Sequence, residues 1–104
     1  MIVTTCDSVP GQEITSTLGL CRGSAIRARH LGKDIMAGLK NMVGGEMHEY
    51  SKLLAETREQ ALDRMIEDAR SKGADAVVAV RYASTSISQG AAEFLAYGTA
   101  VKLA

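Results

Sequence analysis

The sequence predicts a single α+β domain over residues 1–104, and three observations lead to this prediction. Residues 46–71 contain neither Gly nor Pro and show the apolar spacing of one long helix. The runs 76–80 and 94–103 are apolar on both alternating parities, as in strands that are covered on both faces. The N-terminal residues are β-prone and interrupted by a turn. Together these features predict a small, mainly antiparallel sheet packed on helices.

The overall composition disfavours several classes of partner. Lys and Arg together number 12, as do Asp and Glu, so the formal net charge is zero. A neutral chain has no global field that attracts nucleic acid or an anionic membrane. The sequence has no apolar run of the roughly 18 residues that a membrane-spanning helix needs, and no secretory signal is evident. We therefore expect a cytoplasmic protein with no nucleic-acid or membrane partner, and with both cysteines reduced.

The N-terminal part predicts two strands. Residues 2–6 favour a short strand, and Ser8-Val9-Pro10-Gly11 favours a turn. Residues 14–28 favour a long strand, in which Leu18, Leu20 and Ile26 share one parity and Cys21 lies on the other. We expect the parity that carries the leucines and the isoleucine to be the apolar face.

Two helices follow in the predicted order. Residues 33–43 have the spacing of a short amphipathic helix, and Gly44-Gly45 interrupts it. The long helix then runs to Ser71, with Gly73 as its stop. Its apolar face is predicted to consist of Met47, Tyr50, Leu54, Thr57, Ala61, Met65 and Ala69. Between the two C-terminal strands, the small polar residues 84–90 predict a flexible hairpin loop.

The long helix and the doubly apolar strands together predict a homo-oligomer. About 26 helical residues would span roughly 39 Å, whereas a domain of about 100 residues has a radius of gyration near 13 Å. Helices on one face of the sheet leave its second face without a cover. A second copy of the chain is one candidate for this cover, and N-terminal strands that fold back are the other.

Four ordered blocks carry a resemblance to a known family: 29–35 (RHLGKDI), 44–46 (GGE) with Tyr50, 73–78 (GADAVV) and 96–101 (AYGTAV). They resemble the YbjQ-like family of small, uncharacterised bacterial and archaeal proteins, labelled as a heavy-metal-binding domain, and the match spans nearly the whole chain. The resemblance implies a dodecin-like subunit that assembles into a ring, commonly a pentamer, through extra short strands. It implies no established reaction, substrate or agreed ligand set.

The candidate ligands for a divalent or heavy metal ion are Cys21, His30, Asp34 and Glu46. None of them lies at the spacing of a recognised metal motif. In an unbroken strand Cys21 and His30 would point to opposite faces, so only a bulge or a neighbouring subunit would join them. A ring repeats each ligand around its axis, which could build a site without a local motif. Ion pairs and helix N-termini account for the two acidic residues equally well.

The sequence is compatible with two hypotheses about function. The chain contains no catalytic motif, which favours an oligomeric binding or scaffold protein with a metal or small ligand between subunits. The alternative is a small oligomeric enzyme whose intersubunit site uses His30, Asp34 or Glu46 as acid and base. Residues 21–42 are locally basic, and they either bind anions or pair with the acidic long helix of a neighbouring copy.

Overall fold

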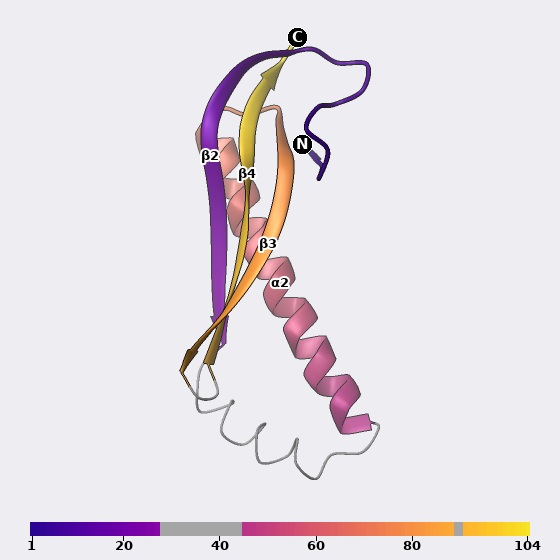
Figure 1. The fold of residues 1–104 in the computed structure, drawn as a ribbon, viewed down its shortest axis with the longest axis vertical. Coiled ribbons are helices and arrows are strands. Elements are labelled where there is room, and N and C mark those ends of the chain that lie inside the picture. Colours follow the sequence, from indigo (N-terminus) through magenta and orange to yellow (C-terminus); the bar gives the residue numbers. More distant parts are fainter. Residues whose placement is uncertain (28–44, 89–90) are drawn as a thin grey trace.

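The computed structural model of this chain describes residues 1–27, 45–88 and 91–104, which form a mixed four-stranded sheet with a helix on one face (Figure 1). The elements are β1 (Ile2–Val3), β2 (Ile14–Arg27), α2 (Gly45–Ser71), β3 (Ala76–Ser88) and β4 (Ala91–Leu103). The strand order is β1-β3-β4-β2. Among the described strands, β1 and β3 pair in parallel and the other two pairs are antiparallel. The α+β prediction is thus confirmed, while the short helix predicted over 33–43 lies outside the described residues.

The long helix α2 forms where the sequence predicts it. Its inner face places Thr57, Ala61, Met65 and Ala69 fully out of solvent. The helix ends at Ser71. Gly73, two residues on, has a φ of 78°, and the Ala74 amide donates to the Ala69 carbonyl at 3.1 Å. This left-handed glycine and six-to-one hydrogen bond are those of a Schellman cap. Within the part of the chain that the structure describes, no helix is sufficiently long and apolar to cross a membrane.

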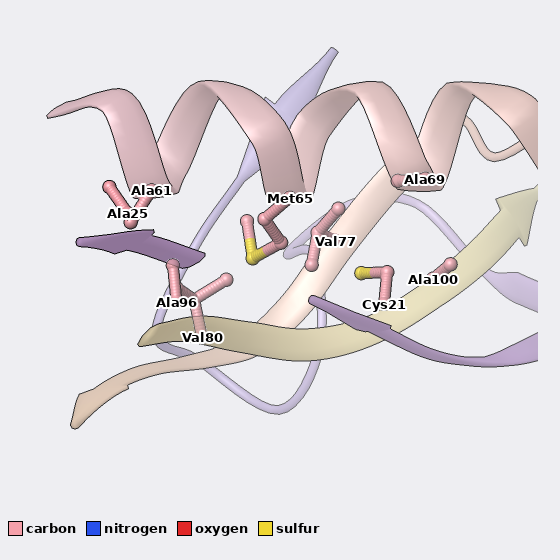
Figure 2. Packing of buried hydrophobic residues seen from close by; sticks show 9 residues of the cluster. All are labelled: Cys21, Ala25, Ala61, Met65, Ala69, Val77, Val80, Ala96 and Ala100. Atoms are coloured by element: carbon pink, nitrogen blue, oxygen red, sulfur yellow. The ribbon is translucent and has the colours of Figure 1, made fainter. Parts of the chain in front are cut away.

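The face of β2 that packs on α2 is the one with small side chains. Cys21 and Ala25 are buried there against Ala61 and Met65 (Figure 2). Gly23 lies between them, and a Cβ added to it would meet the helix backbone, 2.5 Å from the Ala61 oxygen. The expectation that Leu20 and Ile26 define the core face of this strand is therefore wrong. Small residues are needed here because the helix approaches the strand backbone so closely.

Leu18 departs from the strict alternation because β2 contains a bulge. Thr17 pairs with Val101 and Gly19 with Ala100, so Leu18 is an extra residue on β2. Gly19 has a φ of 105°, which favours glycine. Leu18 therefore packs on the core beneath α2, whereas Leu20 does not share its face.

The second face of the sheet, remote from α2, is called the outer face here, and among the described residues the N-terminal segment covers one end of it. Val9 packs there with Ala76, Val78 and Val101 in a second small core. Pro10-Gly11 forms the predicted turn, closed by the Gln12 amide that donates to the Val9 carbonyl at 3.0 Å. The N-terminal residues thus fold back over this end of the sheet. Farther along β2, Leu20 and Ile26 are 59% and 55% exposed.

The hairpin between β3 and β4 is tighter than the sequence predicts. Strand β3 continues to Ser88, and Ser84 and Ser86 pair with Phe94 and Ala92. The prediction of a flexible loop over residues 84–90 is therefore wrong for 84–88. Strand β4 supplies hydrogen-bond partners for the backbone of this polar segment. Its small polar side chains are compatible with a strand because they lie at the exposed edge of the sheet.

A bulge in β3 joins the N-terminal segment to the sheet. Val78 pairs with Thr99 and Arg81 with Tyr97, so the two residues between them face Gly98 alone. Ala79, at a φ of 55°, donates its amide to the Cys6 carbonyl at 2.8 Å, and the Val80 amide donates to the Thr4 carbonyl at 3.0 Å. The short predicted strand over 2–6 is thus realised as β1 followed by these irregular hydrogen bonds.

Candidate functional site

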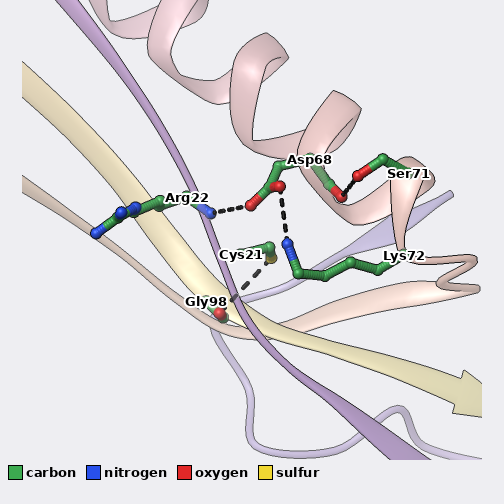
Figure 3. Close-up of polar contacts among 6 residues, drawn as sticks. All are labelled: Cys21, Arg22, Asp68, Ser71, Lys72 and Gly98. Carbon is green, nitrogen blue, oxygen red and sulfur yellow. Dashed lines mark hydrogen bonds and ion pairs between the residues drawn. The ribbon is translucent and has the colours of Figure 1, made fainter.

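Cys21 is the predicted metal ligand whose surroundings the structure describes. It lies on β2, directed toward α2, and is completely buried in the core (Figure 2). Its thiol donates to the Gly98 carbonyl on β4, with 3.6 Å between Sγ and O (Figure 3). The thiol therefore already has a hydrogen-bond acceptor within the chain.

Asp68 of α2 lies beside this thiol, and both of its carboxylate oxygens are engaged. The Arg22 amide donates to Oδ2 at 3.0 Å, and Lys72 Nζ donates to Oδ1 at 2.8 Å (Figure 3). These two hydrogen bonds, that of Lys72 first, lower the pKa of the Asp68 carboxyl. The carboxylate thus joins the end of the helix to β2.

The electrostatic environment keeps the Cys21 thiol protonated. Burial raises its pKa, the negative charge of Asp68 raises it further, and Lys72 offsets only part of this effect. Soft metal ions bind the thiolate rather than the thiol. Cys21 therefore lies in surroundings that oppose metal ligation.

Of the four predicted ligands, the structure describes the side chain of Cys21 alone. His30 and Asp34 lie outside the described residues, and Glu46 lies in the first turn of α2 with its side chain undescribed. Among the side chains that the structure describes, those of residues 1–26, 51–86 and 92–104, no group of three or more His, Cys, Asp or Glu residues is placed to hold a metal ion. The proposed roles of these three residues as metal ligands or as acid and base stay predictions.

The sequence analysis missed a row of side chains across the outer face. Arg22 of β2 pairs with Tyr97 of β4, which pairs with Arg81 of β3, so the three residues lie side by side. The Arg81 guanidinium donates through Nη1 to the carbonyls of Thr5 at 3.0 Å and Val80 at 2.8 Å. The sequence places Arg22 in a locally basic stretch, but its neighbours Tyr97 and Arg81 follow only from the strand register.

These features define a class of protein, an α+β subunit with one long helix on a mixed four-stranded sheet. A sequence model of the YbjQ family, described as "Putative heavy-metal-binding", matches residues 1–104, and the chain belongs to this family. It is 61% identical over 103 residues to a UPF0145 protein from Methanosarcina acetivorans, a match that covers 99% of this chain and 97% of the relative. It is 53% identical over 103 residues to one from Thermus thermophilus, covering 99% and 90%.

A solved structure has the same fold. It is that of a protein with unknown function of the DUF74 family from Pediococcus pentosaceus. The TM-score is 0.67 at 13% sequence identity, and the alignment covers 100% of this chain and 98% of the other. At this level of identity the likeness supports the fold alone.

The surroundings of Cys21 do not match the heavy-metal description of the family. A soft-metal site requires several thiolate or imidazole ligands that converge on one point. Cys21 does not fit such a site, because its thiol is buried and protonated and the adjacent Asp68 is held by Arg22 and Lys72. The described part of the chain therefore provides no metal centre built on Cys21.

The burial of Cys21 leads to a prediction about thiol reactivity. In a Cys6→Ser variant, the remaining thiol should react with an aromatic disulfide reagent at least about tenfold more slowly in native than in denatured protein, because burial suppresses both access and thiolate formation. In the matched Cys21→Ala variant, the exposed Cys6 should react in the native state. Equal native and denatured rates for Cys6→Ser would contradict this assignment.

Proposed function

We propose that this chain is a homo-oligomeric binding or scaffold protein, with a dodecin-like subunit that assembles into a ring through the outer face of its sheet. The observation that carries this proposal is the pair of large apolar side chains left on that face, Leu20 and Ile26, which are 59% and 55% exposed. Each side chain is already partly covered, so burying its exposed part would contribute about 1–2 kcal/mol of transfer free energy.

The dimensions of the subunit support the proposal. Its Cα radius of gyration is 16.9 Å, and its principal extents are 54 × 24 × 16 Å, whereas about 13 Å is typical of a compact domain of 100 residues. In the part of the chain that the structure describes, only the N-terminal segment lies over the second face of the sheet. A second copy of the chain covers the rest of this face in the proposed assembly.

A small ligand or a metal ion between subunits is the binding part of the proposal. A ring brings equivalent side chains together around its axis, so His30, Asp34 and Glu46 are the residues proposed for this role. Cys21 is not among the residues proposed here, because its buried thiol faces α2 within its own subunit.

Native mass spectrometry of tag-free protein tests the assembly and any bound mass in one measurement. We expect the wild-type chain to be a multimer, and the Leu20→Lys/Ile26→Lys double variant to be a monomer. Both positions are more than half exposed in the single chain, so the variant should retain its fold, which circular dichroism checks.

The matched control is Tyr82→Lys, since this apolar side chain is 50% exposed and pairs with Ala96 on the helix side of the sheet. It should leave the number of subunits unchanged. A wild-type monomer would overturn the proposed assembly. Dissociation by Tyr82→Lys without dissociation by the double variant would place the interface on the other face.

A further inference from the structure

The outer face has a positively charged centre. Arg22 and Arg81 flank Tyr97 in one row across three strands, and neighbouring strands lie about 4.8 Å apart. The structure gives neither arginine an ion pair with an acidic side chain of the described residues. On this face the next acidic position is Glu93, which pairs with Ile26 and lies four residues along β4 from Tyr97. The row therefore presents two guanidinium groups on the outer face, and among the described residues Asp68, on the α2 side of β2, interacts electrostatically with Arg22.

The chain itself holds the Arg81 guanidinium in place and fixes the backbone of Arg22. Arg81 donates to two backbone carbonyls, those of Thr5 and Val80. The backbone of Arg22 is fixed by its amide hydrogen bond to Asp68, while its side chain extends away from α2 (Figure 3). Because ordering of long side chains opposes association, the already positioned Arg81 guanidinium is suited to recognise an acidic partner.

The opposite side of the subunit carries the complementary charge. The exposed face of α2 contains an acidic stripe, defined here as Glu56, Glu59, Asp63 and Glu67. Spacings of three and four residues place these side chains in one line along the helix. The buried positions Ala61 and Met65 are on the other side of α2. Of the four acids only Glu67 has an ion pair among the described residues, with Arg70 at 3.0 Å.

We propose that the outer face of one subunit receives the acidic stripe of α2 from a second copy, with Arg22 and Arg81 paired to its carboxylates. This inference rests on the proposed function and names the surface that covers Leu20 and Ile26. Because the two surfaces lie on opposite sides of one subunit, the contact is head-to-tail. Head-to-tail contacts form a closed ring when the rotation between subunits closes.

The two surfaces also agree in length and in apolar content. The stripe from residue 56 to 67 spans about 16 Å along the helix, and β2 from Leu20 to Ile26 spans about 20 Å. Leu62 and Ile66, beside the stripe, are only partly buried by their own sheet. They provide apolar contacts for the exposed side chains of β2.

Charge exchange between the two surfaces tests the inference. We expect Arg22→Glu/Arg81→Glu to dissociate to monomers under conditions where the wild type assembles, because both surfaces are then acidic. Glu59→Lys/Asp63→Lys should dissociate likewise, because both surfaces are then basic. An equimolar mixture should recover mixed assemblies, identified by their masses in native mass spectrometry. Arg58→Glu, at an exposed position of α2 outside the stripe, controls for the change of charge alone.

The outcomes separate this inference from the proposed function. If both charge variants stay assembled while Leu20→Lys/Ile26→Lys dissociates, the outer face is an interface but the acidic stripe is not its partner. If the arginine variant alone dissociates, or the mixture stays monomeric, the stripe is likewise excluded. In that case a titration with inorganic phosphate would test whether the arginine row binds a free oxyanion. A wild-type monomer would overturn both proposals.

Discussion

Substitution of Gly23 by Ala is expected to destabilise the chain by about 3 kcal/mol or more, at the upper end of overpacking effects. A Cβ at this position would lie 2.5 Å from the Ala61 oxygen and 2.6 Å from the Arg64 carbonyl carbon, and against the Met65 amide. All three are helix backbone atoms, which cannot turn away as a flexible side chain can. Accommodating one methyl group therefore requires α2 to move off β2.

Urea unfolding followed by circular dichroism would measure this effect at equal subunit concentration. The matched control is Ser24→Ala, because the next residue along β2 points to the outer face and its backbone carbonyl would still accept from Arg64. This control should stay within about 0.5 kcal/mol of wild type. An unchanged midpoint for Gly23→Ala would show that α2 and β2 are not in such close contact.

Met65→Ala is the second change with a large expected effect, a loss of about 2–5 kcal/mol. Met65 is 0% exposed and is among the largest fully buried side chains of the described residues. It lies between α2 and the small residues of β2 and β4 (Figure 2). The neighbouring alanines have no side-chain length with which to fill the cavity, so relaxation should recover little of the lost free energy.

The control for cavity formation is Met65→Leu, which keeps most of the volume and should cost less than about 1.5 kcal/mol. The same unfolding measurement applies to both variants. Similar losses for Met65→Leu and Met65→Ala would show that side-chain shape, and not cavity volume, determines stability at this position.

The helix was predictable because its signal is local. Its apolar residues recur every three or four positions until Gly73, and this pattern can be recognised without knowing which distant residues the helix contacts. The core face of β2 was not predictable from apolarity, because the closest approach of α2 selects Cys21, Gly23 and Ala25 for small size. The larger Leu20 and Ile26 consequently lie on the opposite face, where hydrophobicity alone would not place them.

The candidate sites depended on pairings that a single sequence does not contain. Arg22, Tyr97 and Arg81 become neighbours only through the registers of two strand pairs. Cys21 looked like a soft-metal ligand by residue type, yet its burial and the nearby Asp68 determine its protonation. The polar run 84–88 likewise became strand because β4 supplies its backbone partners. Each of these outcomes is set by contacts between residues far apart in the chain.

The bulge at Ala79 has a consequence for how the chain unfolds. Chain termini ordinarily fray independently of the domain that follows. Here the amides of Ala79 and Val80 do not bond to β4. They donate instead to the carbonyls of Cys6 and Thr4. Detaching residues 4–6 would leave two amides in the middle of the sheet without protein partners. The first residues of the chain therefore belong to the same cooperative folding unit as the sheet.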